Sequence, residues 1–172
     1  FGEVSRSLSG GSAQLHGLLA SLHPNLALSI LYRDYDRDFQ GNFSSAISEN
    51  SNTINEEGLY AGVQFKINNN WEISSYFDQF KFPWMKYQVD KPNTTGIDGF
   101  LQLVYHPSKK LDIYGRIRHR NRPYNSLNSD MELNEVGIAD QWNYRINFNV
   151  LITESLRLRS RIEYVTYERT GG

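Results

Sequence analysis

Apolar and polar residues alternate with a period of two along most of this sequence. The stretch LRLRSRIEYVTYER (residues 156–169) is the clearest case, with Leu158 and Ile162 in one register and Arg159 and Arg161 in the other. A β-strand sends successive side chains to opposite sides, so such a segment has one apolar and one charged face. The period therefore predicts an all-β chain whose strands each separate two environments.

The alternation recurs often enough to predict about eight or nine strands, the first of them only the end of a strand. The predicted strands cover residues 1–7, 12–22, 26–35, 59–67, 71–80, 97–105, 111–120, 141–152 and 156–169.

The connections between these strands alternate in length. Tight turns are predicted at HPN, NNN, PSKK and TES, which are residues 23–25, 68–70, 107–110 and 153–155. Long polar loops are predicted at residues 36–58, 81–96 and 121–135. Outer-membrane barrels have short periplasmic turns and longer extracellular loops. The pattern therefore favours an antiparallel up-and-down transmembrane β-barrel.

Strand parity bears on how much of a barrel this chain supplies. Residues 1–172 suit one domain that starts on the short-turn side and stops on the long-loop side. A closed single-chain barrel has an even strand number and both ends on the periplasmic side. We therefore expect a segment of a larger barrel, incomplete at both ends. The opening FGEVSRSLSG lacks signal-peptide features, so an exported protein would begin upstream of Phe1.

Composition narrows the function classes. The mean hydropathy is -0.57, and no apolar run approaches the roughly 20 residues that a spanning helix needs, which excludes a helical membrane protein. The net charge of -1 gives no reason to expect nucleic acid as a partner. Without cysteine the chain has neither disulfides nor thiolate metal sites.

Aromatic residues near the ends of the apolar registers are typical of the interfacial girdles of membrane barrels, which contact outer-membrane lipids. The candidate girdle consists of Tyr32, Trp71, Tyr105, Trp142, Tyr144 and Tyr164. The alternative is a soluble β-sandwich that binds carbohydrate or protein, with Trp71, Trp84 and Trp142 at its ligand surface.

An arginine cluster is the strongest chemical signal. It occupies the charged register of three consecutive predicted strands and comprises Arg116, Arg118, Arg120, Arg145, Arg157, Arg159 and Arg161. Because an arginine facing lipid costs about 2–4 kcal/mol near the midplane, a barrel would turn these side chains into its lumen. They then form either an anion-attracting pore wall or a solvated lumen in which they pair with a plug or with carboxylates. The candidate carboxylates are Asp112, Glu163, Glu72 and Asp78.

Other motifs predict no chemistry. Asp34, Asp36 and Asp38 have the spacing of a calcium loop, but Phe39 and Ser45 stand where that loop needs glycine and an acidic residue. The four histidines lack metal-ligand spacing, and no GxSxG nucleophile motif occurs. We therefore predict no metal, no cofactor and no enzymatic activity.

The segment KFPWMKY places apolar residues in a long loop. Phe82, Pro83, Trp84 and Met85 either pack back onto the rim of the barrel or contact an extracellular partner or lipoprotein.

Four phrases resemble outer-membrane barrels of the Bacteroidota: FGEVSRS before an SGG turn, YRDYDRDF, NEEGLYAG and YFDQFKFPW. They resemble the barrel portion of envelope proteins that carry a periplasmic helix-hairpin-helix (ComEA-like) segment, over most of residues 1–84. The resemblance implies a location in the bacterial outer membrane. It implies no catalytic residues, and no helix-hairpin-helix segment is present to suggest a role with DNA.

These patterns together predict a bacterial outer-membrane β-barrel protein. Its role would be that of a pore, or of the embedded barrel in a larger envelope transport or assembly complex. The expected partners are outer-membrane lipids and other envelope proteins or lipoproteins.

Overall fold

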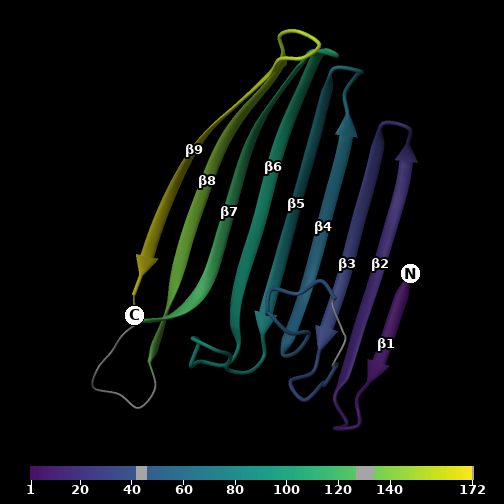
Figure 1. Ribbon diagram of the computed structural model, residues 1–172. Helices are drawn as coiled ribbons and strands as arrows, with labels where there is room; N and C mark the ends of the chain where they lie inside the picture. The colour runs from purple at the N-terminus through teal and green to yellow at the C-terminus, as the bar shows by residue number, and fades with distance from the viewer. Residues whose placement is uncertain (42–45, 127–133, 172) are drawn as a thin grey trace.

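A computed structural model describes residues 1–41, 46–126 and 134–171 and folds them into a single antiparallel sheet of nine strands. The strands follow one another in sequence order, each beside the next, as an up-and-down meander (Figure 1). They are β1 (Gly2–Arg6), β2 (Ser12–His23), β3 (Leu26–Tyr35), β4 (Glu56–Lys66), β5 (Trp71–Phe82), β6 (Thr94–Ser108), β7 (Leu111–Ser126), β8 (Glu135–Leu151) and β9 (Arg157–Thr170).

The predicted segregation of short and long connections is confirmed. Short turns join β2 to β3, β4 to β5, β6 to β7 and β8 to β9 at one end of the sheet. The long connections after β3 and β5 lie at the opposite end, where β7 also ends and β8 begins, and where a short turn joins β1 to β2 (Figure 1). We call these the short-turn end and the long-loop end.

Several strands are longer than the alternation predicts. β8 begins at Glu135 rather than Gln141, and β7 continues to Ser126, where the two strands still pair. The predicted loop over 121–135 is therefore too long; its residues 127–133 lie outside the described residues. Hydropathy could not locate the end of β7, because polar residues occupy both registers of 121–126. On β8, by contrast, Val136 and Ile138 continue the apolar register of the strand.

The sheet has two chemically distinct faces. The apolar face carries the register that includes Ile30, Leu101 and Ile117, which the pairing of successive strands places on one side. The polar face carries the opposite register, with Arg33 on β3 and Arg118 on β7. Alternation in the sequence thus becomes a separation of faces across the whole sheet.

Buried apolar side chains gather at the long-loop end of the polar face. Tyr35 packs with Phe39 and with Ile54 of the loop between β3 and β4, and its hydroxyl donates to the carbonyl of Ile47 at 3.0 Å. Phe82 is completely buried at the end of β5. This small core is built between the polar face and its long loops.

The sheet is open, because β1 and β9 each pair with one strand only among the described residues. The described residues form no helix, and hence none long and apolar enough to cross a membrane.

Candidate functional site: the charged polar face

Arg33 lies at the centre of a buried charge cluster near the long-loop end. Its Nε donates to Glu56 Oε1 at 2.7 Å, and its two terminal nitrogens donate to the two carboxylate oxygens of Asp78 at 2.9 and 3.1 Å. Arg33 and Glu56 are fully buried, and Asp78 nearly so. A guanidinium fits a carboxylate with two parallel hydrogen bonds, so this arginine is fully neutralised where it lies.

Space for Arg33 comes from the strand beside it. Gly58 on β4 pairs with Arg33 in the ladder, and a Cβ at position 58 would lie 2.5 Å from the guanidinium carbon. Any side chain at Gly58 would therefore displace the guanidinium from its two carboxylates.

Glu56 also ties the loop between β3 and β4 to the polar face. Its carboxylate accepts the backbone N–H groups of Glu49 and Asn50 at 2.9–3.0 Å and the hydroxyl of Ser48 at 2.8 Å. Polar groups that lose water need such partners. The loop is therefore folded inward over the sheet.

A second bridge joins this loop to β7. Arg122 forms an ion pair with Glu49 of the inward-folded loop. Loss of water on burial raises the pKa of the Glu49 carboxyl, and Arg122 opposes that rise. Glu49 is therefore easier to protonate than an ordinary glutamate.

Asp98 on β6 is the third buried acid of the polar face, after Glu56 and Asp78. It accepts two hydrogen bonds from Arg118, lies 3.4 Å from Arg120 Nε and accepts the hydroxyl of Tyr76 at 3.2 Å. Because Asp98 is only 2% exposed, its charge is available to these neighbours and not to solvent.

The arginines of β7 and β8 surround a cavity of about 220 Å³, which we call the arginine pocket. Its lining residues are Arg116, Arg118, Arg120, Gln141, Asn143 and Arg145.

Arg116 has neutral partners in this pocket. Its Nε and one terminal nitrogen donate to Gln102 Oε1 at 3.1 and 2.8 Å, and its guanidinium lies 5.0 Å from the ring centre of Phe100. No carboxylate of the described residues forms an ion pair with Arg116. Its positive charge is therefore not cancelled locally.

The remaining predicted arginines lie on the same face but outside the pocket. Arg157, Arg159 and Arg161 stand exposed on β9, opposite Leu151, Asn149 and Asn147 of β8.

The predicted carboxylate partners are right in one case. Glu163 pairs with Arg145 at 2.9 Å. The other three carboxylates do not pair with the predicted arginines, because nearer groups hold them: Asp112 contacts His106, Glu72 accepts from Gln64, and Asp78 binds Arg33.

The six candidate girdle aromatics all project from the apolar face, but not all lie near strand ends. Trp71 and Tyr105 stack at a ring distance of 4.2 Å near the short-turn end, and Tyr32 lies toward the long-loop end. Tyr144 and Tyr164 pair near the middle of β8 and β9.

Trp142 likewise lies well inside β8 and stacks on His119 at 4.2 Å. The expected terminal position of Trp142, Tyr144 and Tyr164 is thus wrong. Trp142 and Tyr144 lie inside β8 because that strand begins six residues before the predicted one, and Tyr164 lies near the middle of β9, whose bounds are close to the predicted ones.

Residues 82–85 pack against the inward-folded loop while leaving part of their surface open. The side-chain amide of Asn55 donates a hydrogen bond to the carbonyl oxygen of Trp84 and accepts one from its N–H group. The guanidinium carbon of Arg37 lies 5.2 Å from the ring centre of Trp84. Phe82 is buried, whereas Trp84 and Met85 remain 45% and 37% exposed. These residues therefore pack back onto the loop between β3 and β4, while packing onto the rim of a barrel and contact with a partner stay predictions.

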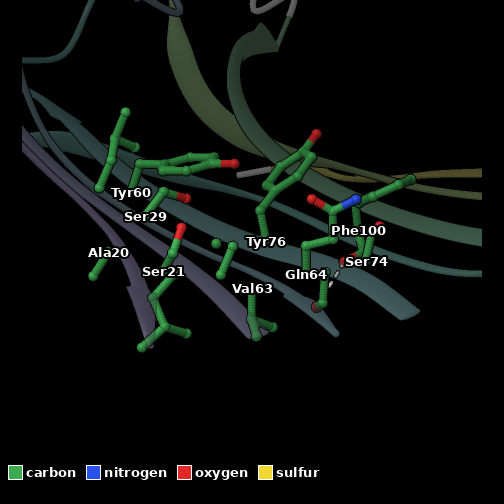
Figure 2. A pocket seen from close by; sticks show the side chains of 14 residues that line it. Ala20, Ser21, Ser29, Tyr60, Val63, Gln64, Ser74, Tyr76 and Phe100 are labelled. Atoms are coloured by element: carbon green, nitrogen blue, oxygen red, sulfur yellow. Dashed lines mark hydrogen bonds between the residues drawn. The ribbon is translucent and has the colours of Figure 1, made fainter. Parts of the chain in front are cut away.

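A groove lined by uncharged side chains occupies the short-turn half of the polar face. It encloses about 530 Å³ over β2 to β6 (Figure 2). Figure 2 shows the side chains of Ser29, Tyr60, Tyr76 and Gln64 around it. No charged side chain lines it, which distinguishes it from the arginine pocket.

The alternate aspartates do not form a common site. Asp34 accepts from Gln14, Asp36 accepts from the backbone and hydroxyl of Ser12, and Asp38 pairs with the neighbouring arginine in the chain. Within the described ranges there is no group of three or more potential metal ligands.

Sequence reasoning missed the Arg33 cluster. The predicted loop over 36–58 contains Glu56, and Asp78 is among the predicted partners of the arginines of β7 to β9. The spacing of charged residues within each strand could have suggested a charged face, but the partners are 23 and 45 residues away from Arg33.

The fold and the site define a class in physical terms: an antiparallel up-and-down sheet with one apolar face and one charged face that is partly covered by its long loops. Comparison with protein-family models, with curated proteins and with solved structures found no match to this chain.

Proposed function

We propose that this chain forms the wall of a transmembrane β-barrel in a bacterial outer membrane. In this role the apolar face contacts lipid, and the polar face lines the lumen. The barrel then acts either as a pore for solutes or as the embedded part of a larger envelope transport or assembly complex.

The uncovered apolar face carries this proposal. One row runs across eight strands, with each residue opposite the next: Ala20, Leu28, Val63, Ser75, Leu101, Ile117, Tyr144 and Tyr164. Leu101 and Ile117 are 48% and 41% exposed in its centre. Soluble proteins rarely expose an apolar surface of this extent, whereas a barrel needs one toward lipid.

The absence of a second layer favours this function over a soluble sandwich. In a sandwich, a second sheet covers the apolar face. The described residues form one sheet, and every strand contacts only its sequence neighbours. The buried apolar core lies instead on the polar face, under the long loops.

Closure of the barrel completes the proposal. The outer edges of β1 and β9 have no strand partner among the described residues. Unpaired backbone groups are costly in lipid, so both edges need strand partners in a membrane, and we propose that further strands supply them. A barrel larger than nine strands meets that requirement.

Ile117→Arg tests the orientation of the sheet. We expect folding into lipid vesicles to weaken by about 2–4 kcal/mol, because the variant places a charge on the lipid side near mid-strand. The measurement is the folded fraction across a urea series, read from heat-modifiable gel migration. The matched control is Ser74→Arg on the polar face, which should fold nearly as well as the unsubstituted chain.

A chain that stays monodisperse in buffer without detergent and does not enter vesicles would instead be a soluble binding module. Equal loss of vesicle folding in Ile117→Arg and Ser74→Arg would contradict the assigned orientation. Conductance of vesicle-folded protein in a planar bilayer separates the two membrane roles: steps of current indicate a pore, and their absence indicates an anchoring barrel.

A further inference from the structure

The arginine pocket carries more positive charge than its partners cancel. Four guanidinium groups line it, whereas the described carboxylates that pair with them are Asp98 and Glu163. Four positive charges against two negative ones leave two positive charges around a cavity of about 220 Å³.

The strand register places two of these arginines side by side, so their positive charges repel each other when no ligand lies between them. Arg116 of β7 and Arg145 of β8 stand directly opposite each other in the ladder. Like charges in directly opposed positions repel, and sheets ordinarily avoid them. A negatively charged ligand between these two side chains would turn the repulsion into two attractions.

Unused hydrogen-bond donors point to the same ligand chemistry. The Nε–H of Arg145 is shielded from solvent and has no acceptor, and Arg116 uses its donors on a neutral amide. Gln141 and Asn143 add amide groups to the lining. Planar guanidinium groups bind carboxylate and phosphate oxygens with paired hydrogen bonds.

We propose that the arginine pocket binds a small divalent oxyanion, a dicarboxylate or a phosphate, between Arg116 and Arg145. Two negative charges match the two uncompensated positive ones. The pocket is built by β7 and β8 with Arg116 anchored on β6, so it lies within one wall of the sheet. The inference therefore does not depend on closure of a barrel or on conductance.

Succinate and inorganic phosphate are the probes, titrated by calorimetry into the full chain in detergent. We expect saturable binding of at least one of them, with acetate much weaker. Arg116→Gln should weaken that binding by at least about tenfold, because it removes a charged donor pair. Arg116→Lys keeps the charge but loses the paired geometry, so its affinity should fall between those of Arg116→Gln and the unsubstituted chain.

Arg161→Gln is the matched control. It removes the same charge from the same face, but Arg161 does not line the pocket. Its effect should stay near twofold at physiological salt, because Arg161 is exposed and acts on the pocket only as a screened charge near Glu163. Equal weakening by Arg116→Gln and Arg161→Gln would reduce the effect to general electrostatics and overturn the proposal. So would the absence of saturable binding of either probe to a folded chain.

Discussion

Arg33 and Arg116 lie on the same face of one sheet in opposite electrostatic settings. Arg33 is fully buried and contacts two carboxylates, which together outweigh its charge. Arg116 is only partly buried and contacts an amide and two aromatic rings. The first arginine is part of the framework, whereas the second keeps its charge available for a ligand.

The difference follows from the cost of burial. An ion withdrawn from water must be paired, because an isolated buried charge is strongly destabilising. A partly exposed ion keeps some hydration, so it tolerates an incomplete set of partners. The polar face thus divides into a part under the long loops, where the buried arginine is fully paired, and a part over β7 and β8, where positive charge is incompletely paired.

Arg33→Met removes the cation at the centre of the buried charge cluster and should have the largest effect on the free energy of unfolding. It leaves Glu56 and Asp78 buried beside each other without their shared cation. We expect the free energy of unfolding to fall by about 3–5 kcal/mol. Urea unfolding of the folded chain in detergent measures this loss.

The matched control is Arg161→Met, which removes an exposed arginine from the same face. It should leave the urea midpoint almost unchanged. If both variants shifted the midpoint equally, the distinction between a framework arginine and an available arginine would fail.

The fold was largely predictable because it rests on local patterns. Period-two alternation located most of each strand, and turn residues such as Pro24 and Asn25 marked the short connections. Each consecutive strand pairs with its predecessor, so the order of the sheet follows from the meander. The same pattern placed all seven predicted arginines on one face.

The buried cluster was not predictable because it depends on long-range register and on loop direction. Arg33 meets Asp78 across the strand between them, β4, and a shift of β5 along it would change that partner. The polar composition of the loop after β3 also does not predict that this loop folds inward over the sheet. That direction comes from the backbone N–H groups of Glu49 and Asn50, which donate to Glu56.

Gly58→Ala sharpens the comparison by disturbing Arg33 without removing a charge. The added methyl group would lie 2.5 Å from the guanidinium carbon, so the side chain must shift away from its partners. We expect a loss of about 1–3 kcal/mol in the free energy of unfolding, typical of overpacking. The same urea titration measures it.

Gly115→Ala is the control for Gly58→Ala. A Cβ at Gly115 on β7 would meet nothing within 4 Å. Alanine there should be neutral or stabilising by up to about 1 kcal/mol, since it restricts the unfolded chain. A destabilisation of Gly115→Ala as large as that of Gly58→Ala would mean that backbone effects, and not displacement of Arg33, explain the loss.

Glu49→Gln tests the point where the inward-folded loop meets the arginines of β7, and its effect should be the smallest. Burial raises the pKa of Glu49 despite its pair with Arg122, so the folded chain takes up this proton more readily than the unfolded chain. The stabilisation due to protonation of Glu49 is complete below the ordinary glutamate pKa of about 4.3 and is lost as pH rises through the raised pKa of the folded chain.

Glutamine cannot ionise, so Glu49→Gln should become more stable than the unsubstituted chain as pH rises between these two pKa values, by at most about 1 kcal/mol. Melting temperatures of both proteins from pH 4 to pH 8 measure the difference. Asp36→Asn should show the opposite trend below the ordinary aspartate pKa of about 3.9, because hydrogen bonds from Ser12 lower the pKa of Asp36. A gap between Glu49→Gln and the unsubstituted chain that narrows toward higher pH would mean that the pair with Arg122 outweighs the cost of burying Glu49.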